Sequence, residues 1–392
     1  MKRVAVLGGG PAGAFAAERL ASAGLDTILL DEKLAWEKPC GGGLTYKAYS
    51  QYPFLIENDR PKRLVNTTYL ASAKAGVAPL HLSKPLVIYS RYDLNSMLLE
   101  RAAGAGAAIE KTRVTEISRD GNGWVLNTRA GKMEADFCVV ATGARNPLRD
   151  VGTKWSTSDT MVALGYYVPT HQEHIDIQFF PQFEGYIWVF PRSGHLSVGI
   201  CGKGESGQAM RARLERYMAE KGLPIKGSTF YGHVLPSLEK PAWGSNRVAG
   251  DGWMAVGDAA GLVDPITGEG LYYAVRSADL ATRVILADAH AAEGQSNAYR
   301  AALRRDFIND LEVASRLAKR LFTGTFFYGD VPSRMIQFMK KSPSFYELIQ
   351  DLFAGTQSYV DLKTRLMKNM RGTMEEMLMN LFFQRLVPGV TR

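Results

Sequence analysis

A turn of three spaced glycines near the start of the chain restricts the fold more than any other feature. The apolar run Val4–Leu7 leads into Gly8-x-Gly10-x-x-Gly13, and the alanine-rich stretch Ala14–Ala23 follows. This order predicts a strand, a tight turn and a helix. Gly8 permits the turn, Gly10 leaves room for a pyrophosphate against the backbone, and Gly13 lets the helix pack closely on the strand. The first amides of the helix would point at the phosphates, so we expect a dinucleotide-binding site.

Two acidic residues follow the second predicted strand, Thr27–Leu30. Asp31 stands eighteen residues after Gly13, where a carboxylate would accept hydrogen bonds from a ribose, and Glu32 is the adjacent alternative. Strand, helix and acid in this order predict a βαβ unit that binds a nucleotide. The competing interpretation is a glycine-rich turn in an α/β protein without a nucleotide.

A second glycine-and-aspartate stretch lies more than two hundred residues downstream. The apolar run Trp253–Val256 leads into Gly257-Asp258, and a predicted helix from about Gly270 follows the sequence Asp264-Pro265-x-x-Gly268-Glu269-Gly270. A carboxylate at Asp258 suits the hydroxyls of a ribityl chain, and the helix N-terminus suits negative charge at the N1–C2=O edge of a reduced flavin. A dehydrogenase that used NAD alone would not need this second site. A helix N-cap is the alternative role for Asp258.

The remaining runs predict two further regions. Phe137–Ala141 is apolar throughout, as is typical of a strand in a buried parallel sheet, and Asp120–Gly123 predicts a hairpin. From Tyr299 onward the pattern predicts helix. An antiparallel sheet, the candidate substrate domain, is predicted by the aromatic-rich or alternating runs Met161–Val168, Ile175–Phe180, Tyr186–Phe190 and Leu196–Cys201.

We therefore expect an α/β fold, α+β overall, with three parts. The Rossmann-like FAD-binding domain is discontinuous and comprises residues 1–70, 85–150 and 240–290. Residues 71–84 and 151–239 form the inserted antiparallel β-sheet substrate domain, and residues 291–392 form a C-terminal helical region.

Composition excludes several classes of protein. Apolar runs stay shorter than the roughly 18 residues that span a bilayer, and glycines interrupt the first run before a signal peptide could form, so we expect a cytoplasmic protein. The widely spaced Cys40, Cys138 and Cys201 predict neither a disulfide framework nor a metal site. No nucleic-acid-binding module is recognisable, so we expect no nucleic-acid partner.

The last quarter of the chain is basic. Residues 300–392 carry 15 Lys and Arg against 9 Asp and Glu. Such a region suits peripheral contact with anionic lipid headgroups, a phosphorylated substrate or an acidic redox partner, and a solvated helical surface is the alternative.

The motifs together resemble those of the FAD-dependent monooxygenases and reductases of the p-hydroxybenzoate hydroxylase fold. The resemblance covers roughly residues 1–285 and includes Ala141-Thr142-Gly143 after a predicted strand. Within this superfamily the chain is most similar to the geranylgeranyl reductase branch. Two stretches carry that similarity, namely Lys38-Pro39-Cys40-Gly41-Gly42-Gly43-Leu44 and Tyr186-x-Trp188-x-Phe190-Pro191.

The resemblance implies FAD as the cofactor and a set of residues that contact it. Ala12 and Asp31 would touch the adenosine half, and Val114 the adenine. Arg91, at the start of a helix, would reach the cofactor, with a surface residue beside the helix N-terminus as the alternative. Cys40 would approach the isoalloxazine ring and is the candidate catalytic residue, with a small buried side chain as the alternative. The expected cofactor-binding residues are Gly8, Gly10, Ala12, Gly13, Asp31, Glu32, Cys40, Gly41, Gly43, Arg91, Val114, Ala141, Gly143, Asp258, Pro265, Gly268, Gly270 and Leu271.

The resemblance also implies a substrate-binding wall made by Tyr186, Trp188 and Phe190. Their alternation would equally fit one face of a strand in the core. The reductases typically place Gly-x-Gly after this stretch, whereas this chain has Gly199-Ile200-Cys201, one position early and with cysteine in place of the second glycine. We therefore expect the floor of the substrate cavity to differ from that of the family.

Three functions remain open at this point. The first is hydride transfer from reduced flavin to carbon–carbon double bonds of an isoprenoid or related apolar substrate or lipid, with NADPH or an external reductase or ferredoxin as electron donor. The second is a monooxygenase or halogenase that acts through a C4a-hydroperoxyflavin on an aromatic or carrier-bound substrate. The sequence has no obvious counterpart of the halogenase lysine, and Lys74 or Lys84 is left open for that role. The third is a flavin module for electron transfer without substrate chemistry, which the separate sheet and helical region disfavour.

Overall fold

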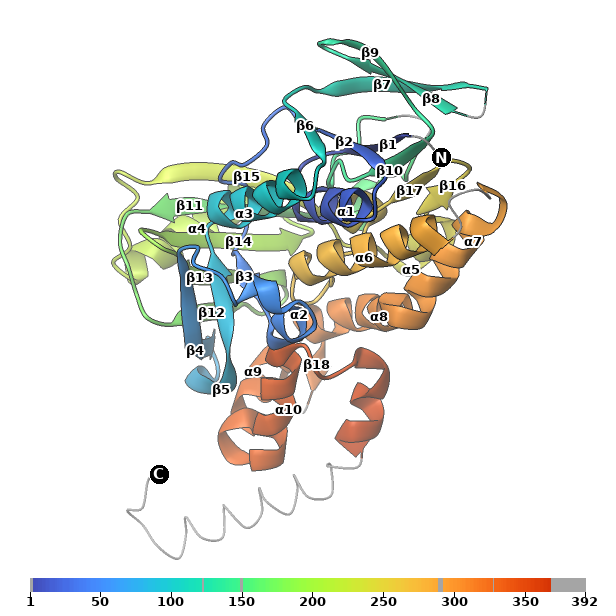
Figure 1. Ribbon diagram of the computed structural model, residues 1–392. Coiled ribbons are helices and arrows are strands. Elements are labelled where there is room, and N and C mark those ends of the chain that lie inside the picture. Colours follow the sequence, from blue (N-terminus) through green and yellow to red (C-terminus); the bar gives the residue numbers. More distant parts are fainter. Residues whose placement is uncertain (1–2, 122, 149–150, 288–291, 327, 368–392) are drawn as a thin grey trace, which may run out of the picture.

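The computed structural model describes residues 3–121, 123–148, 151–287, 292–326 and 328–367. A six-stranded sheet at the N-terminal end of the chain carries the glycine turn (Figure 1). Its central strand β1 is parallel to β2 on one side and to β10 on the other, and β10 is in turn parallel to β17. In spatial order the strands are β16 (Ala249–Gly250), β17 (Trp253–Ala255), β10 (Phe137–Val140), β1 (Arg3–Leu7), β2 (Asp26–Leu30) and β6 (Ala108–Glu110).

Three helices cover this parallel sheet. Helix α1 (Pro11–Ser22) follows the glycine turn directly and packs between α3 (Arg91–Gly104) and α6 (Leu271–Ala287). Its alanine-rich face is buried, which lets the three helices approach closely. Helix α7 (Ala292–Leu303) and a π-helical turn, Arg304–Ile308, continue from α6.

An eight-stranded sheet forms the second layer (Figure 1). Every run predicted to be an antiparallel strand is one, although β4 and β12 pair in parallel. The expected domain division assigned only residues 71–84 of the long β4–β5 hairpin to this sheet. In the structure the whole hairpin belongs to the sheet, because its two strands pair from Lys62 with Tyr89 to Ser72 with Gly76. In spatial order the strands are β15 (Thr229–Pro236), β11 (Thr160–Val168), β14 (Leu196–Lys203), β13 (Glu184–Pro191), β12 (Ile175–Phe179), β4 (Lys62–Ser72), β5 (Gly76–Tyr89) and β3 (Gly43–Leu44).

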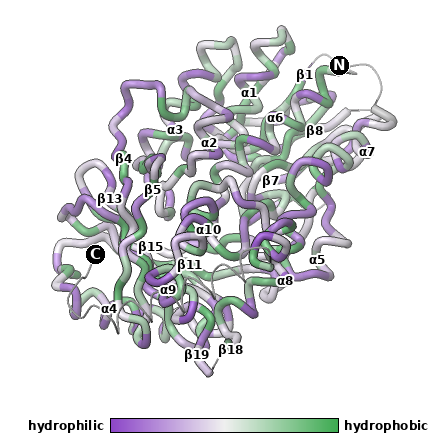
Figure 2. Tube along the Cα trace, turned by 90° about the horizontal axis from the view of Figure 1, so that it is seen from below, coloured by the Kyte–Doolittle hydropathy of each residue, from purple (hydrophilic) through white to green (hydrophobic). Residues whose placement is uncertain are grey.

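Helices lie on both faces of the eight-stranded sheet. Helix α4 (Gly207–Glu220) packs on β11 and β14, and α8 (Asn309–Thr323), α9 (Val331–Lys341) and α10 (Pro343–Ala354) contact β13, β4 and β5. Figure 2 shows hydrophobic and hydrophilic residues alternating along α9 and α10. The hydrophobic ones, such as Ile336 and Ile349, are buried against the sheet, as is typical of amphipathic helices.

The C-terminal region is not helical throughout, so that prediction was wrong for one segment. Strands β18 (Thr325–Phe326) and β19 (Gly329–Asp330) pair after Gly324 ends α8 in an extended conformation. Asp330 then caps α9 by accepting a hydrogen bond from the Ser333 amide, so a new helix starts there. Residues 359–367 are again helical.

The hairpin predicted at Asp120–Gly123 is confirmed and belongs to a three-stranded sheet at the top of Figure 1. The sheet consists of β7 (Val114–Asp120), β8 (Gly123–Thr128) and β9 (Gly131–Ala135). Shorter helices connect the layers: α2 (Tyr46–Gln51), α5 (Lys240–Ser245) and the 3₁₀ turns Pro53–Leu55, Thr157–Asp159 and Gly257–Ala260. Within the described residues, no helix combines the length and the apolar character needed to cross a bilayer. The predicted fold class is confirmed.

Candidate active site

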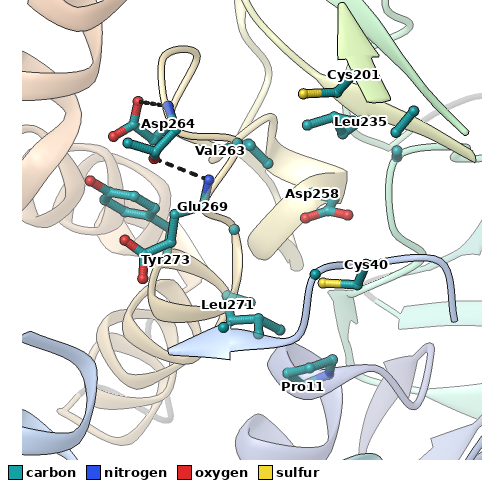
Figure 3. Close-up of a pocket in the computed structure, with 18 of the residues that line it drawn as sticks. Pro11, Cys40, Cys201, Leu235, Asp258, Val263, Asp264, Glu269, Leu271 and Tyr273 are labelled. Carbon is teal, nitrogen blue, oxygen red and sulfur yellow. Dashed lines mark hydrogen bonds between the residues drawn. The ribbon is translucent and has the colours of Figure 1, made fainter. Parts of the chain in front are cut away.

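A continuous cavity of about 830 Å³ runs from the glycine turn to the C-terminal helices. Figure 3 shows Pro11, Cys40, Asp258 and Cys201 around this space, although they come from distant parts of the chain. Of the residues predicted to bind cofactor or substrate, Gly13 and Pro265 do not line it. All the others do: Gly8, Gly10, Ala12, Asp31, Glu32, Cys40, Gly41, Gly43, Arg91, Val114, Ala141, Gly143, Tyr186, Trp188, Phe190, Asp258, Gly268, Gly270 and Leu271.

The three glycines of the first turn have different surroundings. A Cβ at Gly8, whose φ is +116°, would lie 2.3 Å from the Ala141 carbonyl oxygen, and a Cβ at Gly13 would lie 1.9 Å from the Gly8 carbonyl oxygen. These two positions are glycine because strand and helix meet there. A Cβ at Gly10 would meet no atom within 4 Å, so this position faces open space in the cavity. That is the room a pyrophosphate would need at the N-terminus of α1.

The two candidate ribose acids are engaged with the protein itself. One Asp31 oxygen accepts the Gly9 amide at 2.7 Å, and the other accepts the amides of Lys33 and Leu34. Glu32 pairs with Arg113 at 3.5 Å and with Arg129 at 3.8 Å. Both acids remain part of the cavity wall.

Arg91 is a buried cation with unused hydrogen-bonding capacity. Only 3% of the residue is exposed, its terminal nitrogen donates to Asn95 at 3.3 Å, and its Nε has no partner in the described structure. A buried donor without a partner is costly unless a ligand satisfies it. Together with the space at Gly10, this arrangement fits the diphosphate of a dinucleotide.

Asp258 and Lys38 form a charged contact in the middle of the cavity. The Lys38 Nζ lies 3.3 Å from Asp258 Oδ2. Burial acts to raise the pKa of Asp258, but the charges of Lys38, His233 and Arg91 outweigh burial and hold that pKa below its usual value. Burial and the Lys38 charge lower the pKa of His233 to about 4. At neutral pH the cavity therefore presents an ionised carboxylate, which suits the hydroxyls of a ribityl chain.

The segment Asp264–Gly270 forms another wall and leads into α6, whose N-terminus carries a partial positive charge. Asp264 accepts the amides of Ile266 and Thr267 and the Tyr359 hydroxyl, the last at 2.8 Å. Glu269 accepts the Thr45 hydroxyl at 3.2 Å. Burial, and then the charge of Asp264, raise the pKa of Glu269 to about 7. Figure 3 shows these two acids on the opposite side of the cavity from Cys40 and Cys201.

The aromatic residues of β13 face the cavity, while the residues between them face a different core. Tyr186, Trp188 and Phe190 line the cavity, and Ile187 and Val189 pack in the cluster under α4. The Tyr186 hydroxyl donates to the Thr267 carbonyl, and its ring stacks on Phe322 with centroids 6.4 Å apart. A Cβ at Gly41 or at Gly43 would lie 3.2 Å from the Phe190 ring, so the glycine loop lies directly on this wall.

Several cavity residues lay outside the sequence predictions. Lys38 and Glu269 belong to the two motifs quoted from the sequence, so those motifs could have identified them as site residues. Cys201, noted in the sequence only as a departure from the family, also lines the cavity. The apolar pattern of the C-terminal helices was expected to complete the cavity, but it did not show which side chains face it. Those that line it include Leu317, Leu321, Phe322, Met335, Ile349, Leu352, Phe353, Leu362 and Leu366.

The two lysines considered for halogenase chemistry lie elsewhere. Lys74 is 62% exposed and pairs with Asp330 at 3.7 Å, and Lys84 lies over the Tyr46 ring. Neither lines the cavity, whereas Lys38 and Lys47 do. Of the cysteines, Cys138 is buried in the parallel sheet, and Cys40 and Cys201 line the cavity.

The chain is similar to known oxidoreductases in sequence. Residues 2–161 match the family model for pyridine nucleotide-disulphide oxidoreductases. The chain is 29% identical to the chloroplastic geranylgeranyl diphosphate reductase of Oryza sativa subsp. japonica, over 73% of this chain and 66% of that protein. It is 28% identical to the geranylgeranyl diphosphate reductase of Synechocystis, over 73% of this chain and 75% of that protein.

Solved structures share the fold. A geranylgeranyl bacteriochlorophyll reductase-like protein from Thermoplasma acidophilum superposes with a TM-score of 0.75 at 20% identity, covering 94% of this chain and 99% of that one. A flavin-dependent brominase superposes with a TM-score of 0.68 at 16% identity, with the same coverage.

Proposed function

We propose that the chain is a flavin-dependent oxidoreductase of the geranylgeranyl reductase-like branch, and that it uses FAD to reduce carbon–carbon double bonds of an isoprenoid or a related apolar substrate. The observation that carries the proposal is the continuity of the cavity. It joins the space at Gly10 and the unpaired Arg91 Nε, through Asp258, to an aromatic wall closed by apolar C-terminal helices.

The residues of this cavity match the successive parts of FAD. Gly10 and Arg91 suit the diphosphate, Val114 and the acids Asp31 and Glu32 suit the adenosine, and the ionised Asp258 suits the ribityl hydroxyls. The positive N-terminus of α6 at Leu271 suits the N1–C2=O edge of the ring. When bound, the flavin supplies a hydride for the alkene.

The protein must supply an apolar environment and a proton. Trp188, Phe322 and the side chains of α9 and α10 exclude water around an apolar chain. Saturation of a double bond consumes one hydride and one proton. Glu269 lines the same cavity, and its pKa of about 7 leaves the carboxyl partly protonated at neutral pH, which supports it as the proton source.

The electron donor and the substrate's surroundings belong to the same proposal. We expect NADPH or a separate reductase or ferredoxin to reduce the flavin. Basic residues of the C-terminal helices, such as Arg320 at the cavity wall, suit a phosphate or a peripheral contact with anionic headgroups.

Oxygen-dependent chemistry is the second candidate, because flavin-dependent brominases and halogenases share the fold and because Lys38 lies in the cavity. However, Lys38 pairs with the Asp258 carboxylate, and this favours a role for Lys38 in binding the cofactor over the role of the halogenase lysine.

An anaerobic single-turnover assay tests the proposal. The full-length protein, loaded with FAD and reduced chemically, is mixed with geranylgeranyl diphosphate, and the product is analysed by mass spectrometry. We expect stoichiometric flavin oxidation and a gain of two mass units per double bond. A different result would favour the second candidate: the flavin stays reduced until oxygen is admitted, and an aromatic acceptor is then hydroxylated or halogenated. Gly10→Ala, which we expect to fold but to bind FAD at least tenfold more weakly, is the matched control.

A further inference from the structure

Arg192 is a fully buried cation that contacts the loop carrying Cys40. None of its side chain is exposed. The guanidinium donates to the Glu37 carboxylate, to the Cys40 carbonyl and, at 3.3 Å, to the Gly41 carbonyl. The Ser197 hydroxyl donates to the same Cys40 carbonyl at 2.9 Å. Arg192 follows the aromatic stretch of β13 directly, so this cluster ties the aromatic wall to the loop.

Glu37 extends the cluster to a third cavity wall. Its two carboxylate oxygens accept the backbone amides of Arg91 at 3.0 Å and Tyr92 at 3.2 Å. These amides are the first of α3, where a negative charge is favoured. The Arg192–Glu37 pair therefore links the loop to the start of α3, where the Arg91 Nε has no partner in the described structure.

The loop itself is confined from its other side. Gly42 has φ of +86°, a Cβ there would lie 2.1 Å from the Tyr89 carbonyl oxygen, and its own carbonyl accepts the Tyr89 amide at 3.0 Å. Phe190 packs against the flanking glycines. The loop has little room to move while Arg192 stays in place.

We propose that Arg192, held by Glu37, is a positioning residue that sets the Cys40–Gly43 loop and the Arg91 end of α3 in their cofactor-binding geometry before any ligand arrives. The planar guanidinium suits this task because it donates to three groups in fixed directions, which a lysine ammonium cannot reproduce. The inference rests on the proposed function only for the identity of the ligand. Its test uses the free protein and needs no turnover.

Hydrogen exchange of the full-length wild-type protein tests the inference without any substitution. We expect peptides spanning residues 37–43 to exchange at least a hundredfold more slowly than an unstructured chain, with or without added FAD. Exchange at the unstructured rate in the flavin-free protein, with protection only after FAD is added, would overturn the proposal, because the cofactor would then order the loop.

Alkylation of the partly exposed Cys40 by iodoacetamide provides a second readout. We expect R192K and E37Q each to raise the alkylation rate and the FAD dissociation constant at least tenfold. The control is R213K, which alters a partly exposed Arg–Glu pair with Glu205 outside the cavity and should leave both values within twofold of wild type. A folded R192K with wild-type alkylation and FAD affinity would contradict the inference. If the variants alter Cys40 alkylation but the wild-type protein reduces no alkene, the result supports the role of Arg192 and contradicts only the proposed function.

Discussion

The Lys38 ammonium lies 3.3 Å from the Asp258 carboxylate, although 220 residues separate them along the chain. Lys38 precedes the glycine loop and Asp258 follows the last strand of the parallel sheet, so their contact brings the two halves of the proposed flavin site together. Both side chains are partly exposed to the cavity, which leaves the carboxylate accessible to a ligand.

Asp258→Asn should weaken FAD binding with little change in the fold. The amide keeps the shape of the side chain but loses the charge that strengthens hydrogen bonds to ribityl hydroxyls. We expect the dissociation constant, measured by quenching of flavin fluorescence, to rise at least tenfold, or about 1.4 kcal/mol. The control Asp26→Asn, which breaks an exposed ion pair with Arg3 outside the cavity, should leave the dissociation constant for FAD unchanged.

Substitutions at two glycines of the first turn should separate folding from cofactor binding. Gly10→Ala places a methyl group in open cavity space, so the protein should melt within a few degrees of wild type and lose FAD affinity at least tenfold. Gly13→Ala drives a methyl group to 1.9 Å from a carbonyl oxygen, so it should lower the melting temperature strongly. Equal melting temperatures for the two variants would contradict this assignment.

Glu269 should impose a pH dependence on stability. Below its usual value of 4.5 both the folded and unfolded chains hold the proton. Between there and about pH 7 the unfolded chain releases it while the folded chain retains it, so the free energy of unfolding falls as the pH rises. Glu269→Gln removes this contribution. In urea denaturation, the free energy of unfolding of the variant should increase relative to that of wild type from pH 5 to pH 8. If the two free energies change with pH in parallel, the Glu269 pKa is not raised.

Cys201→Leu should affect the apolar half of the cavity alone. The larger side chain projects from β14 beside the aromatic wall and reduces the space for an apolar ligand. We expect binding of geranylgeraniol, followed by equilibrium dialysis, to weaken at least fivefold while FAD affinity stays within twofold of wild type. Cys138→Ala, in the core of the parallel sheet, should lower stability and leave both affinities unchanged.

Parts of both large sheets were predictable from local pattern. The Gly8–Gly13 turn, the apolar strand ending at Val140 and the aromatic strand around Trp188 each follow from short-range geometry, because turn type and strand alternation depend on neighbouring residues. The β18–β19 pair was missed because Gly324 and Asp330 end one helix and begin another within a region of mostly helical pattern.

The sequence alone determined which segments we propose for the cofactor, because a glycine turn after a strand and an acid at a strand end are local features that neighbouring residues specify. Tertiary structure alone decided that Lys38 meets Asp258, that Arg192 donates to the Cys40 carbonyl and that Tyr359 reaches Asp264. These contacts join residues more than ninety positions apart. Their geometry depends on how two sheets and the C-terminal helices pack, which no local periodicity encodes.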